Sequence, residues 1–149
     1  HMLVHSLTKS SIFFTVGHAC QMHDTQEMSR IKGLVRGNPL VGWGLLFGVM
    51  AIVGMPPFGV FTSEFLILTA TMKDAPYLTP FLLLGLGVAF AALFRRVQPM
   101  VSGHRPPNQH ILKVAHIPVV LHMALVLIIG LYMPNFLSQW FHMAVELLK

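Results

Sequence analysis

Hydrophobic residues fall along the chain in long runs that are separated by short polar connections. A helix needs about 20 apolar residues to cross a bilayer, and four runs are long enough: about 3–22, 40–72, 77–97 and 112–133. The last segment, about 135–148, interleaves apolar and polar side chains as an amphipathic helix on a membrane surface does. The pattern predicts an all-α membrane protein, with four transmembrane helices and a C-terminal amphipathic helix in a single membrane domain over residues 1–149.

The second run contains a strong helix breaker. It is longer than a straight crossing needs, and Pro56-Pro57 lies inside it between Gly54 and Gly59. Proline lacks an amide donor and collides with the preceding helical turn, so a helix cannot pass through this pair undisturbed. We therefore expect the second transmembrane helix to be discontinuous at Pro56-Pro57 and to restart near Gly59.

Composition supports a membrane protein and excludes several other classes. The chain is 54% hydrophobic and 10% charged, with a mean hydropathy of +0.68, whereas soluble domains carry about 25% charged residues. A single cysteine, Cys20, supports neither a disulfide framework nor a thiolate-ligated cluster, so we expect no cofactor. The basic residues lie in short connections and not on one soluble face, which argues against a nucleic-acid partner.

The distribution of Lys and Arg predicts an orientation. The side of the membrane opposite the first and third connections has only Lys73 and Lys149. Those two connections hold most of the basic residues: Arg30, Lys32, Arg36, Arg95, Arg96, Arg105 and Lys113. By the positive-inside rule, connections 23–39 and 98–112 face the cytoplasm and both ends of the chain face outward from the cell inner (plasma) membrane. The spacing of Asp24 and Glu27 favours a short surface helix that ends near Gly33.

Lys9 is a charged residue within the first apolar run. His5 precedes it by one helical turn, so both side chains share a face, with the hydroxyls of Ser6, Thr8, Ser10 and Ser11 nearby in sequence. A lysine at the centre of a spanning helix costs about 2.5–3.5 kcal/mol on insertion scales, so it normally faces a wet cavity or a partner. The alternative is that Lys9 lies near the helix end and extends to the lipid headgroups.

Glu64 is a carboxylate within the second run. It falls in the first two turns of the half-helix that restarts after Gly59, where the positive end of the helix dipole favours a negative charge. Broken helices in transporters place such half-helix ends around an ion site. The pattern predicts a carboxylate that takes up and releases a proton, and the alternative is a proline kink that serves packing, with Glu64 paired structurally.

Histidines suggest one further candidate and no metal site. His104, His110, His116 and His122 recur every six residues, which puts successive rings on different faces of a helix. His122, in the middle of the fourth run, is a candidate proton relay because histidine titrates in the physiological range. A core histidine that is hydrogen-bonded to a neighbouring helix fits the same position.

Two motifs together carry a family resemblance. The stretch HSLTKSSIFFTVGH (5–18), followed after a basic loop by GWGLLFGVMAIVGMPPFGVFTSEFLIL (42–68), resembles the antiporter-like membrane subunits of respiratory complex I and of membrane-bound hydrogenases, most closely the hydrogenase-4 component F type. The resemblance implies an ion-translocating module without its own redox cofactor. It also implies that His5, Lys9 and Glu64 carry protons and that Pro56 and Pro57 form the helix break.

The resemblance also implies partners and an incomplete chain. Members of the family are considerably longer, so residues 1–149 look like the C-terminal part of an antiporter-like subunit. The implied partners are other membrane subunits of a hydrogenase or complex I-like assembly and, through them, a peripheral redox arm, all within a lipid bilayer.

The prediction is a non-catalytic, proton-translocating subunit, or part of one, in a hydrogenase or NADH:quinone oxidoreductase-like complex, coupled to redox chemistry in other subunits. Two alternatives stay open. A small proton-coupled multidrug exporter would need only four helices and one membrane glutamate, and a purely structural membrane anchor would use its polar groups to hold helices together. The broken helix and Lys9 argue against the exporter.

Overall fold

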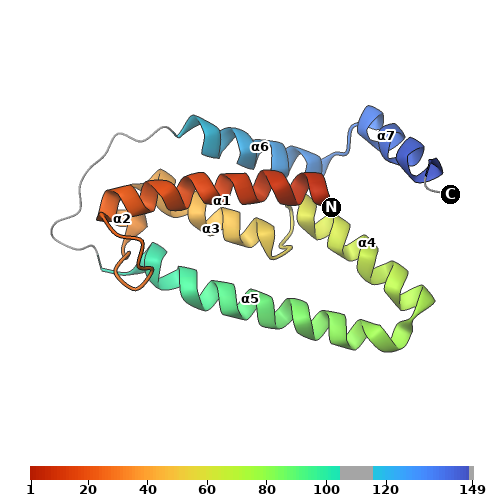
Figure 1. Cartoon of the computed structure of the whole chain (residues 1–149), viewed down its shortest axis with the longest axis horizontal. Helices are drawn as coiled ribbons and strands as arrows, with labels where there is room; N and C mark the ends of the chain where they lie inside the picture. Colours follow the sequence, from red (N-terminus) through yellow and green to blue (C-terminus); the bar gives the residue numbers. More distant parts are fainter. Residues whose placement is uncertain (105–115, 148–149) are drawn as a thin grey trace.

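The computed structural model describes residues 1–104 and 116–147, and these residues form helices and connecting turns without any strand. The elements are α1 (Met2–His23), α2 (Leu34–Gly37), α3 (Pro39–Ile52), α4 (Gly59–Asp74), the 3₁₀ turn η1 (Pro76–Leu78), α5 (Thr79–Ser102), α6 (Ile117–Leu131) and α7 (Asn135–Glu146) (Figure 1). The predicted all-α fold is confirmed. Parts of the predicted connection 98–112, of the predicted span 112–133 and of the C-terminal helix fall on residues 105–115 and 148, outside the described residues.

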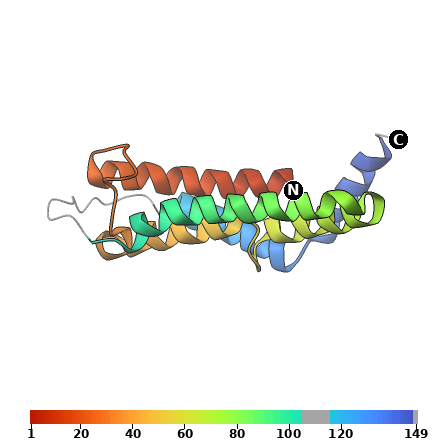
Figure 2. The same ribbon diagram turned by 90° about the horizontal axis from the view of Figure 1, so that it is seen from below.

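Helices α1, α3 and α6 pack against one another and, with α5, run along the long axis of the molecule (Figures 1 and 2). The buried residues of α1 recur every three or four positions, as one face of a helix requires: Val4, Thr8, Ser11, Thr15, Ala19 and Met22. Most of them are small, which lets neighbouring helices approach closely in the manner of membrane helix pairs.

Three hydroxyls on this buried face are hydrogen-bonded. Thr8 Oγ1 donates to the Val4 carbonyl at 2.8 Å and Thr15 Oγ1 to the Ser11 carbonyl at 2.8 Å. Ser11 Oγ donates at 3.3 Å to the carbonyl of Val119, which belongs to α6. We call Thr8, Ser11 and Thr15 the hydroxyl seam. Each of its buried hydroxyls has a hydrogen-bond acceptor inside the protein, so none of these donors is left unpaired.

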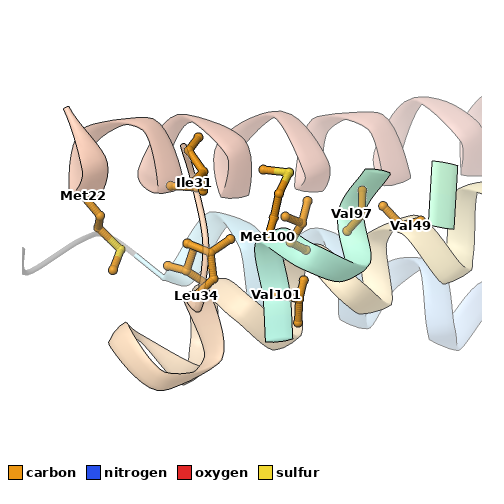
Figure 3. Packing of buried hydrophobic residues seen from close by; sticks show 10 residues of the cluster. Met22, Ile31, Leu34, Val49, Val97, Met100 and Val101 are labelled. Atoms are coloured by element: carbon orange, nitrogen blue, oxygen red, sulfur yellow. The ribbon is translucent and has the colours of Figure 1, made fainter. Parts of the chain in front are cut away.

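A hydrophobic core lies at the end of the bundle that contains α2. Met22, Ile31 and Leu34 from the first connection and its flanks meet Val97, Met100 and Val101 of α5 (Figure 3). The two basic connections are side by side here, since a Cβ built on Gly103 would lie 3.1 Å from Cβ of Lys32.

The prediction of a short helix that starts at Asp24 and Glu27 is wrong. Asp24 adopts a left-handed conformation (φ 49°, ψ 40°) and ends α1, with its backbone N–H donating to the Cys20 carbonyl. The next helix, α2, begins only at Leu34, after Gly33 with φ 68°. Burial of Ile31 and Leu34 in the core at this end fixes the connection in another conformation.

The second predicted span is interrupted. α3 ends at Ile52 and α4 begins at Gly59, and the backbone of residues 53–58 turns with Gly54 at φ 71°. Pro56 and Pro57 lie within this break. α6 packs directly on it, because a Cβ on Gly130 would collide with the Pro57 carbonyl and lie 2.7 Å from the Phe58 carbonyl carbon. The absence of a side chain at Gly130 thus lets α6 approach the backbone of the break.

Helices α4 and α5 form a hairpin joined by η1, and α5 returns to the end where α2 lies (Figure 1). Among the described residues, one helix, Pro76–Ser102, is long and apolar enough to cross a membrane, and only 6% of its apolar window is buried. The pair α6 and α7, bent by 77°, adds a second span if it is counted as one, and Pro39–Ile52 is apolar but shorter. Four transmembrane helices therefore stay a prediction.

α7 follows α6 after a sharp bend and points away from the bundle (Figure 2). None of its residues is buried. Most of its apolar side chains, Phe136 and Trp140 among them, are exposed in the described chain, as expected for a helix whose apolar side meets something outside these residues.

Candidate functional site

Glu64 lies in the second turn of α4, at the wall of a cavity between α4 and α5. The cavity has a volume of about 310 Å³. Glu64 is half-buried, and the other lining side chains are apolar or absent: Val53, Gly54, Phe61, Phe65, Leu68, Leu83, Leu86, Gly87 and Phe90. Among the described residues, no side chain or backbone group donates a hydrogen bond to this carboxylate. The site is thus a single ionisable group in an apolar cavity that is open to the outside of the described chain, where Phe65 and Leu83 are about half exposed.

The break positions this carboxylate through Gly54. A Cβ at Gly54 would lie 2.8 Å from Cδ of Glu64 and would collide with Oε2. The φ of Gly54, 71°, also lies in the left-handed region, where a side chain is strained. Two separate features therefore favour glycine at position 54: the backbone conformation of the turn and the space that the carboxylate occupies.

Lys9 and Glu64 do not line a common cavity. Lys9 is exposed on α1 and contributes to a shallow pocket with Ser10, Phe13 and Phe14. His5, one turn earlier, is half-buried, and its ring stacks on that of His1 with centroids 5.3 Å apart.

The hydroxyls that flank Lys9 in sequence divide between the two sides of α1. Thr8 and Ser11 are fully buried in the hydroxyl seam, whereas Ser6 is exposed like Lys9. The predicted polar surroundings of Lys9 are therefore smaller than the sequence suggested, because two of the hydroxyls serve packing against α6 and local hydrogen bonds.

His122 is held by its own helix. Its Nδ1 lies 2.7 Å from the Pro118 carbonyl and so donates to it. The ring is half-buried and lies 5.8 Å from that of Phe14, a residue of the pocket beside Lys9.

Sequence reasoning missed a polar contact between α1 and α4. His1 Nδ1 and Ser63 Oγ are 2.8 Å apart, and Ser63 Oγ donates to the Val60 carbonyl at 2.8 Å. Because Ser63 directly precedes Glu64, and His5 stacks on His1, this contact joins the His5 side of α1 to the helix that carries the carboxylate. A serine beside the glutamate was the only available signal.

A separate cavity of about 270 Å³ lies among α1, α3 and α6. His18 and His116 both line it, with ring centroids 6.3 Å apart in an edge-to-face arrangement. Nδ1 of His18 is buried and has no hydrogen-bond partner among the described residues. Glu64 does not line this cavity.

The chain matches the family described as "NADH:quinone oxidoreductase/Mrp antiporter, TM" over residues 1–93. It is 40% identical over 149 residues to the hydrogenase-4 component F homolog of Methylacidiphilum infernorum, covering 100% of the chain and 31% of that relative. Identity to NADH-ubiquinone oxidoreductase chain 4 of Petromyzon marinus is 26% over 133 residues, or 86% of the chain and 29% of the relative.

A third relative is a Na(+)/H(+) antiporter subunit of Alkalihalophilus pseudofirmus. The identity is 22% over 133 residues, covering 85% of the chain and 27% of the relative. The chain thus spans less than a third of the length of each of these relatives.

Proposed function

The chain belongs to the NADH:quinone oxidoreductase/Mrp antiporter family of transmembrane subunits, and from this premise we propose that it is part of a proton-translocating membrane subunit. In this proposal the complete subunit works in a hydrogenase or NADH:quinone oxidoreductase-like complex. The redox chemistry takes place in other subunits, and this chain moves protons in response to it.

The observation that carries the proposal is the placement of Glu64. Its carboxylate lies against the break between α3 and α4 and faces a chamber that is otherwise apolar. A charge at membrane depth is expensive, and such residues mark ion pathways by default. Glu64 lies in the second turn of α4, where the helix dipole offsets little of this cost because its effect falls off within the first turn.

Proton uptake neutralises the carboxylate, and the neutral acid is the form that an apolar chamber favours. Release then needs a cation or water within reach. We assign this exchange to Glu64, and we assign proton transfer on the α1 side to Lys9, His5 and His122. Because Lys9 and Glu64 line different cavities, the two sides communicate in this proposal through the contact of His1 with Ser63.

The proposed orientation puts connections 23–39 and 98–112 on the cytoplasmic side of the inner membrane and the ends of the chain outward. Its support is that the described parts of both basic connections meet at one end of the bundle, beside Lys32 and Gly103. The proposed partners are the other membrane subunits of the complex, a peripheral redox arm reached through them, and lipid.

The test replaces Glu64 and Lys9 singly by Ala in the assembled complex and measures redox-driven proton uptake in membrane vesicles. We expect pumping to fall by about tenfold or more in each variant, since a positioned proton-transfer group commonly contributes about 10²–10⁴-fold. Assembly is checked on a native gel. Glu146→Ala, at the end of α7, and Lys73→Ala, at the end of α4, are the controls with matched charges.

Normal pumping in both test variants, with assembly intact, contradicts the proposal and supports a structural anchor. If pumping is lost in the Glu64 variant and not in the Lys9 variant, the proton pathway runs on the α4 side only and does not include Lys9.

A further inference from the structure

The cavity among α1, α3 and α6 is lined by none of the residues assigned to proton transfer. Its inner wall includes Thr15 and Val119, which are buried, and its outer rim includes Trp43, Phe47 and Val120, which are exposed. The cavity is therefore reached from outside the described chain, between α3 and α6. Its volume of about 270 Å³ is just below the range of about 300–1,000 Å³ for small-molecule sites, so it suits a slender occupant.

This cavity has a polar end and an apolar end. His18, near the end of α1, and His116, just before α6, lie toward the end of the bundle that contains α2 (Figure 1). Met123 and Leu127 line the cavity further along α6. At 1.5 Å per residue, Leu127 lies about 16 Å along the helix axis from His116. The cavity thus matches an amphiphile that has a polar group beside the histidines and an extended hydrocarbon chain along α6.

The polar end has an unused hydrogen-bonding group. Nδ1 of His18 is buried and has no hydrogen-bond partner in the part of the chain that the structure describes. Buried polar atoms normally have a partner. The ring of His116 lies nearby, edge-to-face with that of His18, so two imidazoles are available to an incoming polar group.

Positive charge and an aromatic rim lie at the same end of the cavity. α2 packs on α3, because a Cβ at Gly42 would lie 2.5 Å from the backbone nitrogen of Val35, and the next residue, Arg36, is exposed. Arginine near a membrane surface attracts anionic lipid headgroups. Trp43, which follows Gly42, is enriched as a residue type at headgroup depth. The polar end of the cavity therefore suits the headgroup of an anionic lipid.

We infer that this cavity binds one acyl chain of an anionic phospholipid, whose headgroup lies toward Arg36 and whose polar oxygens approach the two histidines. The chain fills the space between α3 and α6 that the described residues leave open. The second acyl chain stays in the bilayer. This inference does not depend on proton translocation, because lipid binding needs only the geometry of the cavity and a membrane.

The first experiment fills the cavity. The assembled complex is placed in vesicles of phosphatidylethanolamine and phosphatidylglycerol that contain phosphatidylglycerol with a photoreactive diazirine at the end of one acyl chain. After illumination, labelled peptides are identified by mass spectrometry. We expect label on residues 123–127 and a severalfold loss of it in Ala124→Trp, since Ala124 lines the cavity. Ala91→Trp, on an exposed position of α5 that does not line the cavity, should leave the label unchanged.

The second experiment changes the polar end. We expect His18→Leu to lower the labelling severalfold, and His18→Gln, which keeps a hydrogen-bonding side chain, to retain most of it. Unlabelled phosphatidylglycerol should compete severalfold better than unlabelled phosphatidylcholine. Arg36→Gln should reduce this preference. Lys73→Gln, an exposed position at the end of α4, is the control and should leave the preference as in the wild type.

Three results would overturn the inference. The first is wild-type labelling in an assembled Ala124→Trp complex. The second is equal competition by the two lipids, which removes the anionic headgroup. The third is the absence of label on residues 123–127 in the wild-type complex, which favours a helix of a neighbouring subunit as the occupant. Normal pumping in Glu64→Ala overturns the proposed function and leaves all these labelling results unaffected, so the two proposals fail separately.

Discussion

The two halves of the interrupted helix, α3 and α4, differ in burial and in charge. α3 is buried along its length through Val41, Leu45 and Val49, contacts α1, α2, α5 and α6, and contains no charged residue. α4 is buried only at Gly59 and Val60, in its first turn, and carries Glu64, Lys73 and Asp74.

The two helices differ in how they are held: α3 is anchored in the bundle, whereas α4, which carries the carboxylate, is held mainly at its start. α3 has an N-cap, Asn38, whose side chain accepts from the Val41 N–H, and Pro39 at its first turn, so its N-terminal end and its buried face are both fixed. α4 has no side-chain cap at Phe58, and its fixed point is the contact of the break with Gly130 of α6. The carboxylate therefore lies in the second turn, close to the place where α4 is held, and few residues in the rest of the helix are buried.

Paired leucine truncations should give the largest contrast. Leu45 in α3 is 1% exposed and Leu66 in α4 is 61% exposed. We expect Leu45→Ala to cost about 2–5 kcal/mol through lost contacts and a cavity, and Leu66→Ala to stay within about 0.5 kcal/mol. Both values are measured as free energies of unfolding of the detergent-solubilised chain by titration with SDS. Equal losses would mean that α4 is packed as tightly as α3.

The contact that holds α4 should show the next largest effect. Gly130→Ala puts a methyl group against the backbone of Pro57 and Gly59, and we expect a loss of about 1–3 kcal/mol in the same titration, as in other overpacked sites. Gly85→Ala, which meets open space, is the matched control and should gain up to about 1 kcal/mol from helix propensity. A stable Gly130→Ala variant would show that the break does not depend on α6.

The smallest effect should come from the cap of α3. Asn38 Oδ1 accepts from the Val41 N–H at 3.4 Å, a long hydrogen bond, so we expect Asn38→Ala to cost about 0.5 kcal/mol, at the low end for N-caps. Asn38→Ser keeps an acceptor and should restore most of this. Helical content measured by circular dichroism during the titration checks that the loss is at α3. No change in stability would mean that burial alone positions this half.

Local rules were enough to predict an all-α chain and the break in its second apolar run. The proline pair interrupts a helix wherever it stands, and the i, i+4 spacing puts His5 and Lys9 on one face in any helix. These features depend on residues that are close in sequence, which is why they could be read without knowing which helices meet.

The close approach of Gly54 to Glu64 could not be predicted in this way. It depends on the direction in which α4 leaves the break, and that direction is set by α6 packing at Gly130. The surroundings of Lys9 could not be predicted for a related reason, since Ser11 donates a hydrogen bond to a carbonyl of α6 and Thr8 donates one to a carbonyl of its own helix. In the first connection, burial of Ile31 and Leu34 outweighed the capping pattern of Asp24 and Glu27.

α5 is buried only near its two ends. Thr79 at its start and Val97, Met100 and Val101 at its close are buried, and the residues between them are not. The unsupported middle contains Leu83, Leu86, Gly87 and Phe90, which face Glu64. Because packing among the described residues holds α5 at its two ends and not between them, the distance from α5 to the acidic group depends on how those two ends are anchored.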